Sequence, residues 1–161
     1  MKSLRELYRI GQGPSSSHTM GPRLAAETFL STHLGAAGFE VILYGSLAAT
    51  GKGHMTDVAI TEALSVAEMP INIVWKPDVF LPYHPNGMTI KALDSQGFPT
   101  DEVTYYSMGG GAVEEEGKPL TKSAEIYTLN SMSEILEYCE STGRSYWEYV
   151  EQCEGKEIWD Y

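Results

Sequence analysis

Hydrophobic residues recur at helical spacing in two stretches of the first 116 residues. One amphipathic helix is expected over residues 21–33, where Pro22 suits a first turn and Gly35 suits a stop. A second is expected over residues 54–66. A shorter helix is expected over residues 3–9. The pattern therefore predicts two main helices in this part of the chain.

Shorter runs of apolar and β-branched residues predict strands between and after these helices. They lie at residues 39–43, 71–76, 86–94 and 101–108, and the last two are close enough in sequence to form a hairpin. The run LAATGKGH, residues 47–54, predicts a glycine-rich turn. We therefore expect an α+β fold with a mixed or antiparallel sheet of about four to five strands and two main helices on one face.

The character of the chain changes after residue 116. Residues 117–129 look like a linker, and two helices with capping-box spacing follow, at Ser131 with Glu134 and at Ser145 with Glu148. These observations divide the chain into two parts. We expect one domain over residues 1–116 and a linker with acidic helices, a C-terminal helical appendage, over residues 117–161.

The net charge of −11 is concentrated near the C-terminus, where residues 114–161 carry 12 acidic and 4 basic side chains. No basic stripe is present, so nucleic acid is not an expected partner. No apolar run reaches the roughly 18 residues of a membrane span, and we expect no membrane partner. The N-terminus, MKSLRELYRI, is charged where a signal peptide needs an apolar stretch, so we expect a cytoplasmic protein.

The chain has two cysteines, Cys139 and Cys153, and no CxxC spacing. The pattern predicts free thiols rather than a zinc site or a redox pair, and it predicts no metal bound by this chain. Two cysteines also cannot supply the four thiolates of an ordinary iron–sulfur cluster.

The run GPSSSHTMGP places Ser15, Ser16, Ser17, His18 and Thr19 directly before a predicted helix. Helix N-termini offer free N–H groups and the positive end of the helix dipole. Several hydroxyls there would make a cradle for a carboxylate or a phosphate. The alternative is an ordinary N-cap, for which a single serine would be enough.

The run GSLAATGKGHMTD invites comparison with a phosphate-binding loop but does not match one. Its glycine spacing is one residue too long, and Gly53 stands where Ser or Thr should follow Lys52. The run presents Lys52 and His54, and Asp57 lies about one helical turn after His54, where a carboxylate could orient the imidazole. The alternative is a solvated helix start with an acidic first turn.

Two further motifs precede or end strands. Asn86 and Gly87 form a turn signal, for which an ordinary bend is the alternative to a functional role. Ser107 is followed by three glycines at residues 109–111, which indicate either positive φ in a strand bulge or close approach of the backbone to a ligand. A serine hydrolase is not favoured, because the G-x-S-x-G elbow is missing. A pyridoxal phosphate enzyme using Lys52 would be unusually short.

Taken in order, GPSSSHTMGP, YGSLAATGKGHMTD, HPNGM and YYSMGGG resemble the β part of iron–sulfur-dependent L-serine dehydratase, also called L-serine ammonia-lyase, over residues 1–116. The resemblance implies deamination of L-serine to pyruvate and ammonia, assisted by a [4Fe–4S] cluster. The cluster is held by an α part that is a separate chain or is fused. It further implies that this chain binds no cluster, is inactive alone, and shares an α+β fold with the allosteric substrate-binding domain of some phosphoglycerate dehydrogenases.

The resemblance also implies roles for the matching positions. His18 and His54 are the candidates for acid/base or orienting work in catalysis. The other matching positions are candidates for binding L-serine: Ser15, Ser16, Ser17, Thr19, Lys52, Gly53, Asp57, Asn86, Gly87, Ser107, Gly109, Gly110 and Gly111.

Two other functions stay open at this point. The chain could be a regulatory module that senses L-serine without taking part in the chemistry, or an anion-binding module unrelated to serine. A homodimer is the default expectation for a metabolic enzyme.

Overall fold

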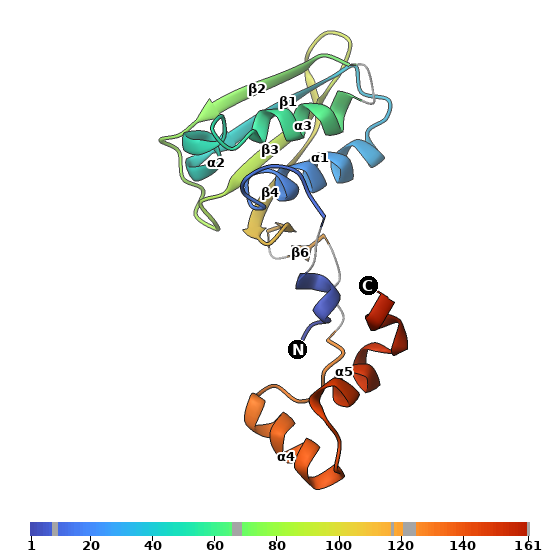
Figure 1. Ribbon diagram of the computed structural model, residues 1–161. Helices are drawn as coiled ribbons and strands as arrows, with labels where there is room; N and C mark the ends of the chain where they lie inside the picture. The colour runs from blue at the N-terminus through green and yellow to red at the C-terminus, as the bar shows by residue number, and fades with distance from the viewer. Residues whose placement is uncertain (8–9, 66–68, 117, 121–124, 161) are drawn as a thin grey trace. The chain divides into compact units, whose positions relative to one another are not determined.

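A computed structural model describes the chain over residues 1–7, 10–65, 69–116, 118–120 and 125–160. The chain divides into two compact units, one of residues 11–121 and one of residues 1–10 with 122–161 (Figure 1). The ends of the helices predicted over 3–9 and 54–66, and residues 117 and 121–124 of the predicted linker, lie outside the described residues.

The first unit is built on a mixed six-stranded sheet of order β2-β1-β3-β4-β5-β6, in which β1 and β2 are parallel and the other pairs antiparallel. The α+β class and the β3–β4 hairpin are therefore confirmed. Its elements are α1 (Met20–Thr32), β1 (Gly38–Tyr44), α2 (Gly45–Thr50), α3 (Thr56–Leu64), β2 (Ile71–Lys76), β3 (Gly87–Leu93), β4 (Pro99–Gly109), β5 (Ala112–Glu115) and β6 (Lys118–Pro119).

The helices of this unit cover one face of the sheet (Figure 1). Alternate residues of β1, namely Phe39, Val41 and Leu43, point to that face and are almost completely buried. Phe29 of α1 and Leu64 of α3 belong to the same core. These three side chains of β1 thus join the helices to the sheet.

Two features differ from the predicted fold. The sheet has six strands rather than four or five. The prediction gave too few strands because β5 and β6 have only four and two residues and show little alternation. The predicted turn over residues 47–54 is wrong in its first half, where α2 continues directly from the end of β1. Leucine and alanine favour the helix there, and the glycine-rich turn is confined to the residues that follow Thr50.

The second unit contains η1 (Leu4–Leu7), α4 (Met132–Thr142), α5 (Tyr146–Glu154) and η3 (Lys156–Asp160). Both predicted capping boxes are present at the starts of α4 and α5. Its small core combines Tyr127, Ile135, Cys139 and Tyr149, and both cysteines are free thiols, as predicted. In the part of the chain that the structure describes, no helix is long and apolar enough to cross a membrane.

The buried carboxylate of Glu154 ties the N-terminal segment to this second unit. It accepts hydrogen bonds from Ser3 Oγ at 2.7 Å, from the Leu4 amide at 2.6 Å and from Tyr127 Oη at 2.7 Å. The Met1 amino group also donates to the Tyr127 carbonyl at 2.9 Å. Residues 1–7 therefore fold with the C-terminal helices, a pairing that hydrophobic spacing along the chain cannot indicate.

The Glu154 contacts predict an acid-sensitive N-terminal segment. Burial raises the pKa of Glu154, but the hydrogen bonds from Ser3, Leu4 and Tyr127 outweigh it and hold the pKa below its usual range. The carboxylate therefore contributes stability that is complete above the ordinary glutamate pKa and is lost as the pH falls through its lower folded value. We expect the hydrogen-exchange protection of the Leu4 amide to fall in that acidic range.

The variant Glu154→Gln should reduce the protection of the Leu4 amide at pH 7 by about tenfold or more, because hydrogen bonds to a charged acceptor are the stronger ones. Exchange measured by NMR checks this. The exposed Glu140, changed to Gln, is the matched control. Equal protection in all three proteins would contradict the role of Glu154.

Candidate functional site

His18 is the centre of the first sequence motif and is only 7% exposed. Its Nδ1 is hydrogen-bonded with the hydroxyls of Ser17 at 3.0 Å and Ser15 at 3.3 Å. Its Nε2 lies 3.0 Å from Thr50 Oγ1 and 3.3 Å from the Ser46 carbonyl oxygen. Thr50 Oγ1 donates its proton to the Ser46 carbonyl, so toward His18 both of these oxygens can only accept. Nε2 therefore carries the proton, and Nδ1 accepts from a serine hydroxyl. The hydrogen bonds thus hold the ring as a neutral imidazole of defined tautomer.

The serines of this motif do not cap α1. Thr19 occupies the N-cap position, but its side chain makes no capping bond and donates to the Ser15 carbonyl at 2.7 Å. The amide of Gly21 donates to the Ser16 carbonyl at 3.0 Å, so backbone groups close the turn. The ordinary N-cap interpretation therefore does not account for these hydroxyls.

His54 lies beside His18, with ring centroids 4.7 Å apart and ring planes inclined at 47°. Its Nδ1 lies 3.1 Å from the Thr50 carbonyl oxygen, which can only accept, so Nδ1 carries the proton. The Asp57 carboxylate, the orienting group suggested by spacing, instead accepts from the amide of Val58 at 3.0 Å. A backbone carbonyl therefore orients His54, and Asp57 serves the first turn of α3.

The environment of His18 lowers its pKa. Burial is the main cause, the hydrogen bond to the Ser46 carbonyl opposes it, and the neighbouring His54 lowers the pKa further. His18 is therefore expected to be neutral at pH 7, and its stabilising effect should be lost as the pH falls below the ordinary histidine pKa.

An NMR titration of the ring protons should place the midpoint of His18 below 6.5, the usual histidine value. In His54→Gln the midpoint should rise only slightly, since burial is the larger cause. A His18 midpoint at or above 6.5 in the wild-type chain would contradict this assignment.

Gly51 is the glycine that shapes the turn of the second motif, next to the candidate binding residues Lys52 and Gly53. A β-carbon at Gly51 would clash with the Leu47 carbonyl and lie 2.8 Å from the Trp75 ring, whereas at Gly53 it would make only an ordinary contact. Lys52 is exposed, with its Nζ 5.5 Å from the centroid of the Trp75 ring. Lys52 and Gly53 thus lie on the outer side of the turn that presents His54.

The third motif connects α2 to the sheet. The Ser46 amide donates to the Pro85 carbonyl at 3.1 Å, which places residues 85–86 beside the start of α2. Asn86 Nδ2 donates to the Ser107 carbonyl at 3.3 Å, and the Ser107 amide donates to the Asn86 carbonyl at 3.0 Å. A β-carbon at Gly87 would lie 2.7 Å from Leu81, so this glycine permits close packing.

The fourth motif lies against the start of α1. Ser107 is completely buried, and its Oγ has no hydrogen-bond partner among the described residues. A β-carbon on Gly21, in the first turn of α1, would collide with this hydroxyl. Gly109, Gly110 and Gly111 all have positive φ, and they form the turn and register shift between β4 and β5. Their conformation is explained by this turn.

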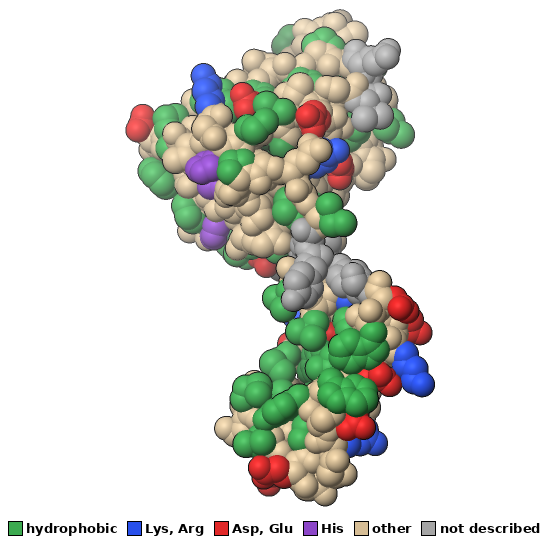
Figure 2. Space-filling view, viewed as in Figure 1, with side chains coloured by type: hydrophobic (Ala, Val, Ile, Leu, Met, Phe, Trp, Pro, Cys, Tyr) green, Lys and Arg blue, Asp and Glu red, His purple; other side chains and the backbone are tan. Residues whose placement is uncertain are grey.

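The four motifs therefore meet where β1 and β4 end and where β3 and α1 begin. Histidine side chains are visible on this unit's surface in Figure 2.

Two hydroxyl-bearing residues of the site, Ser46 and Thr50, were not among the residues predicted from the sequence, although their spacing of four would place them on one helix face. No group of three or more His, Cys, Asp and Glu side chains within the described ranges is arranged to hold a metal.

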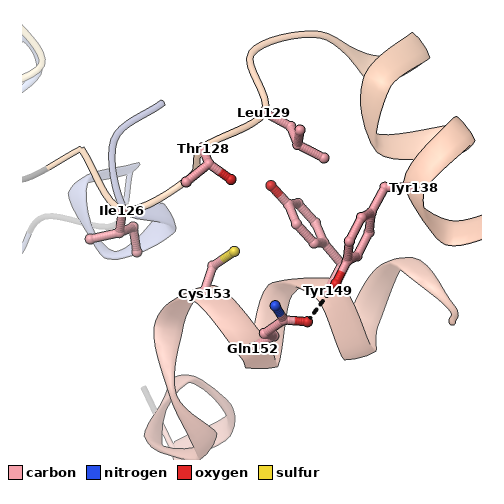
Figure 3. A pocket seen from close by; sticks show the side chains of 7 residues that line it. All are labelled: Ile126, Thr128, Leu129, Tyr138, Tyr149, Gln152 and Cys153. Atoms are coloured by element: carbon pink, nitrogen blue, oxygen red, sulfur yellow. Dashed lines mark hydrogen bonds between the residues drawn. The ribbon is translucent and has the colours of Figure 1, made fainter. Parts of the chain in front are cut away.

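The second unit has a separate pocket of about 300 Å³ between α4, α5 and the segment before α4 (Figure 3). The Tyr149 hydroxyl points into it, and Tyr138 Oη donates to Gln152 Oε1 at 2.9 Å. None of the predicted site residues lines it. Its lining consists of Ile126, Thr128, Leu129, Tyr138, Tyr149, Gln152 and Cys153.

Comparison with known proteins gives consistent matches. The family model described as "Serine dehydratase beta chain" matches residues 3–71 and 65–118. The L-serine dehydratase of Haemophilus influenzae is 33% identical over 186 residues, covering 89% of this chain and 41% of that protein. L-serine dehydratase TdcG of Escherichia coli is 35% identical (90% and 41%), and the L-serine dehydratase of Streptomyces coelicolor is 32% identical (89% and 41%). The chain thus spans about two fifths of the length of these relatives.

Proposed function

Since the chain belongs to the serine dehydratase beta chain family, we propose that it forms one wall of the site at which an L-serine dehydratase converts L-serine to pyruvate and ammonia. The observation that carries this proposal is the pair of imidazoles of His18 and His54, whose ring centroids lie 4.7 Å apart, with the hydroxyls of Ser17 and Thr50 bonded to His18. Imidazoles beside hydroxyl groups suit a reaction that removes a proton from a small polar substrate.

The two histidines are proposed to have different tasks. Both nitrogens of His18 are already hydrogen-bonded, so this ring holds Ser17 and Thr50 in place and orients the substrate. His54 has its proton on Nδ1, which leaves the lone pair on Nε2 to accept a proton. We assign His54 as the base for the proton on the α-carbon of L-serine. The exposed edge of the serine turn before α1 supplies hydroxyl donors for the substrate carboxylate.

The elimination needs an electrophile for the departing hydroxyl group, and a [4Fe–4S] cluster would act there as a Lewis acid. This chain does not fit as the holder of such a cluster. Its two cysteines, Cys139 and Cys153, both belong to the second unit and are too few to hold such a cluster. The cluster is therefore assigned to an α part, either a separate chain or a fused one.

The test compares pyruvate formation from L-serine by this chain alone and by the chain combined with the cluster-bearing α part. We expect activity only in the combination. Calorimetric titration of the chain alone with L-serine, with D-serine and phosphate as controls, then separates the alternatives. Stereoselective binding, together with a His18→Ala enzyme whose activation curve shifts at unchanged saturated turnover, would replace the catalytic role by a regulatory one.

A further inference from the structure

The turn between α2 and α3 ends a helical segment in a way that normally uses glycine. The Thr56 amide donates to the Gly51 carbonyl at 2.9 Å, and the Met55 amide donates to the Lys52 carbonyl at 3.4 Å. Two such bonds enclosing a left-handed residue define a Schellman motif, in which the left-handed position is most often glycine. Here that position is Met55, with φ 63° and ψ 32°.

The Met55 backbone conformation is unfavourable for a residue with a side chain. In the left-handed region the β-carbon crowds the following carbonyl oxygen, and glycine avoids this. Among the described residues, only Met55 and Glu116 have positive φ without being glycine. Strained residues of this kind cluster at functional sites, where the surrounding structure holds them in the unfavourable conformation.

The Met55 side chain contributes little to the core, because Met55 is 48% exposed. It directly follows His54, the proposed base. Val58, about one helical turn further along α3, is also exposed, at 40%. The start of α3 thus carries two exposed apolar side chains, Met55 and Val58, directly after His54 in the sequence, where solvated polar residues would be the ordinary choice for a helix start.

We propose that Met55 is a shielding residue of the candidate site, retained at a glycine position because its thioether side chain covers the edge of His54 when L-serine is bound. This inference rests on the proposed function. A flexible, polarizable methionine adapts to a small substrate and excludes water. Excluding water strengthens the electrostatic interactions between the base and the substrate.

Two variants separate the backbone conformation from the side chain. Met55→Gly relieves the conformation and removes the side chain, so Tm should rise by about 2–4 °C while kcat/KM for L-serine in the complete enzyme falls about tenfold. Met55→Ala keeps the unfavourable conformation, so Tm should stay near that of the wild type while kcat/KM falls as in the glycine variant.

The control is Met69→Ala. Met69 is 37% exposed and precedes β2, at the end of the sheet opposite to Tyr44 and the site. It should leave kcat/KM unchanged. Met55→Gly with wild-type kcat/KM would overturn the inference, and so would a fall in both Tm and kcat/KM, which would indicate a merely structural residue. If the wild-type complete enzyme forms no pyruvate, the proposed function itself fails, and the Tm comparison still measures the strain at Met55.

Discussion

Replacing His54 by alanine in the complete enzyme is expected to lower the turnover of L-serine by about 10²-fold or more, the scale for loss of a positioned acid/base group. The reason is the geometry of the ring. The Thr50 carbonyl holds the proton on Nδ1, so Nε2 is the nitrogen able to accept the α proton. Pyruvate formation at saturating L-serine, followed with a coupled dehydrogenase, measures the effect.

His33→Ala is the matched control for this prediction. His33 is also bound to a backbone carbonyl, that of Phe29 at 2.8 Å, but its Nε2 pairs with Asp101 at 2.9 Å, away from the four motifs. This variant should keep most of the turnover. Because His54 is partly exposed, His54→Ala should fold normally, and an unchanged melting temperature would show that the loss is chemical. Near-normal turnover in His54→Ala would remove His54 from the role of base.

The parts of the fold that local chemistry determines could be predicted from the sequence. The capping boxes at Ser131 and Ser145 each need only a residue three positions further on, and both are present. The strand predicted over residues 39–43 needs only a run of apolar and β-branched residues, and it is present as β1. Features formed by distant contacts could not be predicted. The N-terminal segment folds with the last helices because Ser3 bonds to Glu154, 151 positions away.

The same distinction applies to the candidate site. The side chains of the serine turn and of His54 were predicted, and the structure brings His18 and His54 together. Their orienting partners include backbone carbonyls, those of Ser46 and Thr50, which every residue has and no motif marks. Spacing suggested the Asp57 carboxylate as the group that orients His54, because a sequence motif identifies side chains and not backbone carbonyls. Sequence motifs therefore indicate candidate side chains more readily than the backbone groups that orient them.

A backbone position at the start of α2 provides the largest expected effect on stability. Gly45 has φ 47°, and a β-carbon there would lie 2.7 Å from the Pro85 carbonyl oxygen and 2.9 Å from the Phe80 ring. Gly45→Ala combines an unfavourable conformation with overpacking against backbone, and should lower the free energy of unfolding by about 2–4 kcal/mol. Chemical denaturation of this chain measures the loss.

Two glycines separate these causes. Gly97 has φ 85° and open space around it, so Gly97→Ala should lose only the conformational part, about 1–2 kcal/mol. Gly35 has neither feature, and Gly35→Ala should stay within about 0.5 kcal/mol of the wild type. The clash at Gly45 also displaces Pro85, whose carbonyl holds the Ser46 amide, and the Ser46 carbonyl faces His18 Nε2. The NMR midpoint of His18 should therefore change in Gly45→Ala and in neither control. A change in all three would assign the effect to general loosening, whereas a change in Gly45→Ala alone would establish that the bend between β1 and α2 positions the histidine pair.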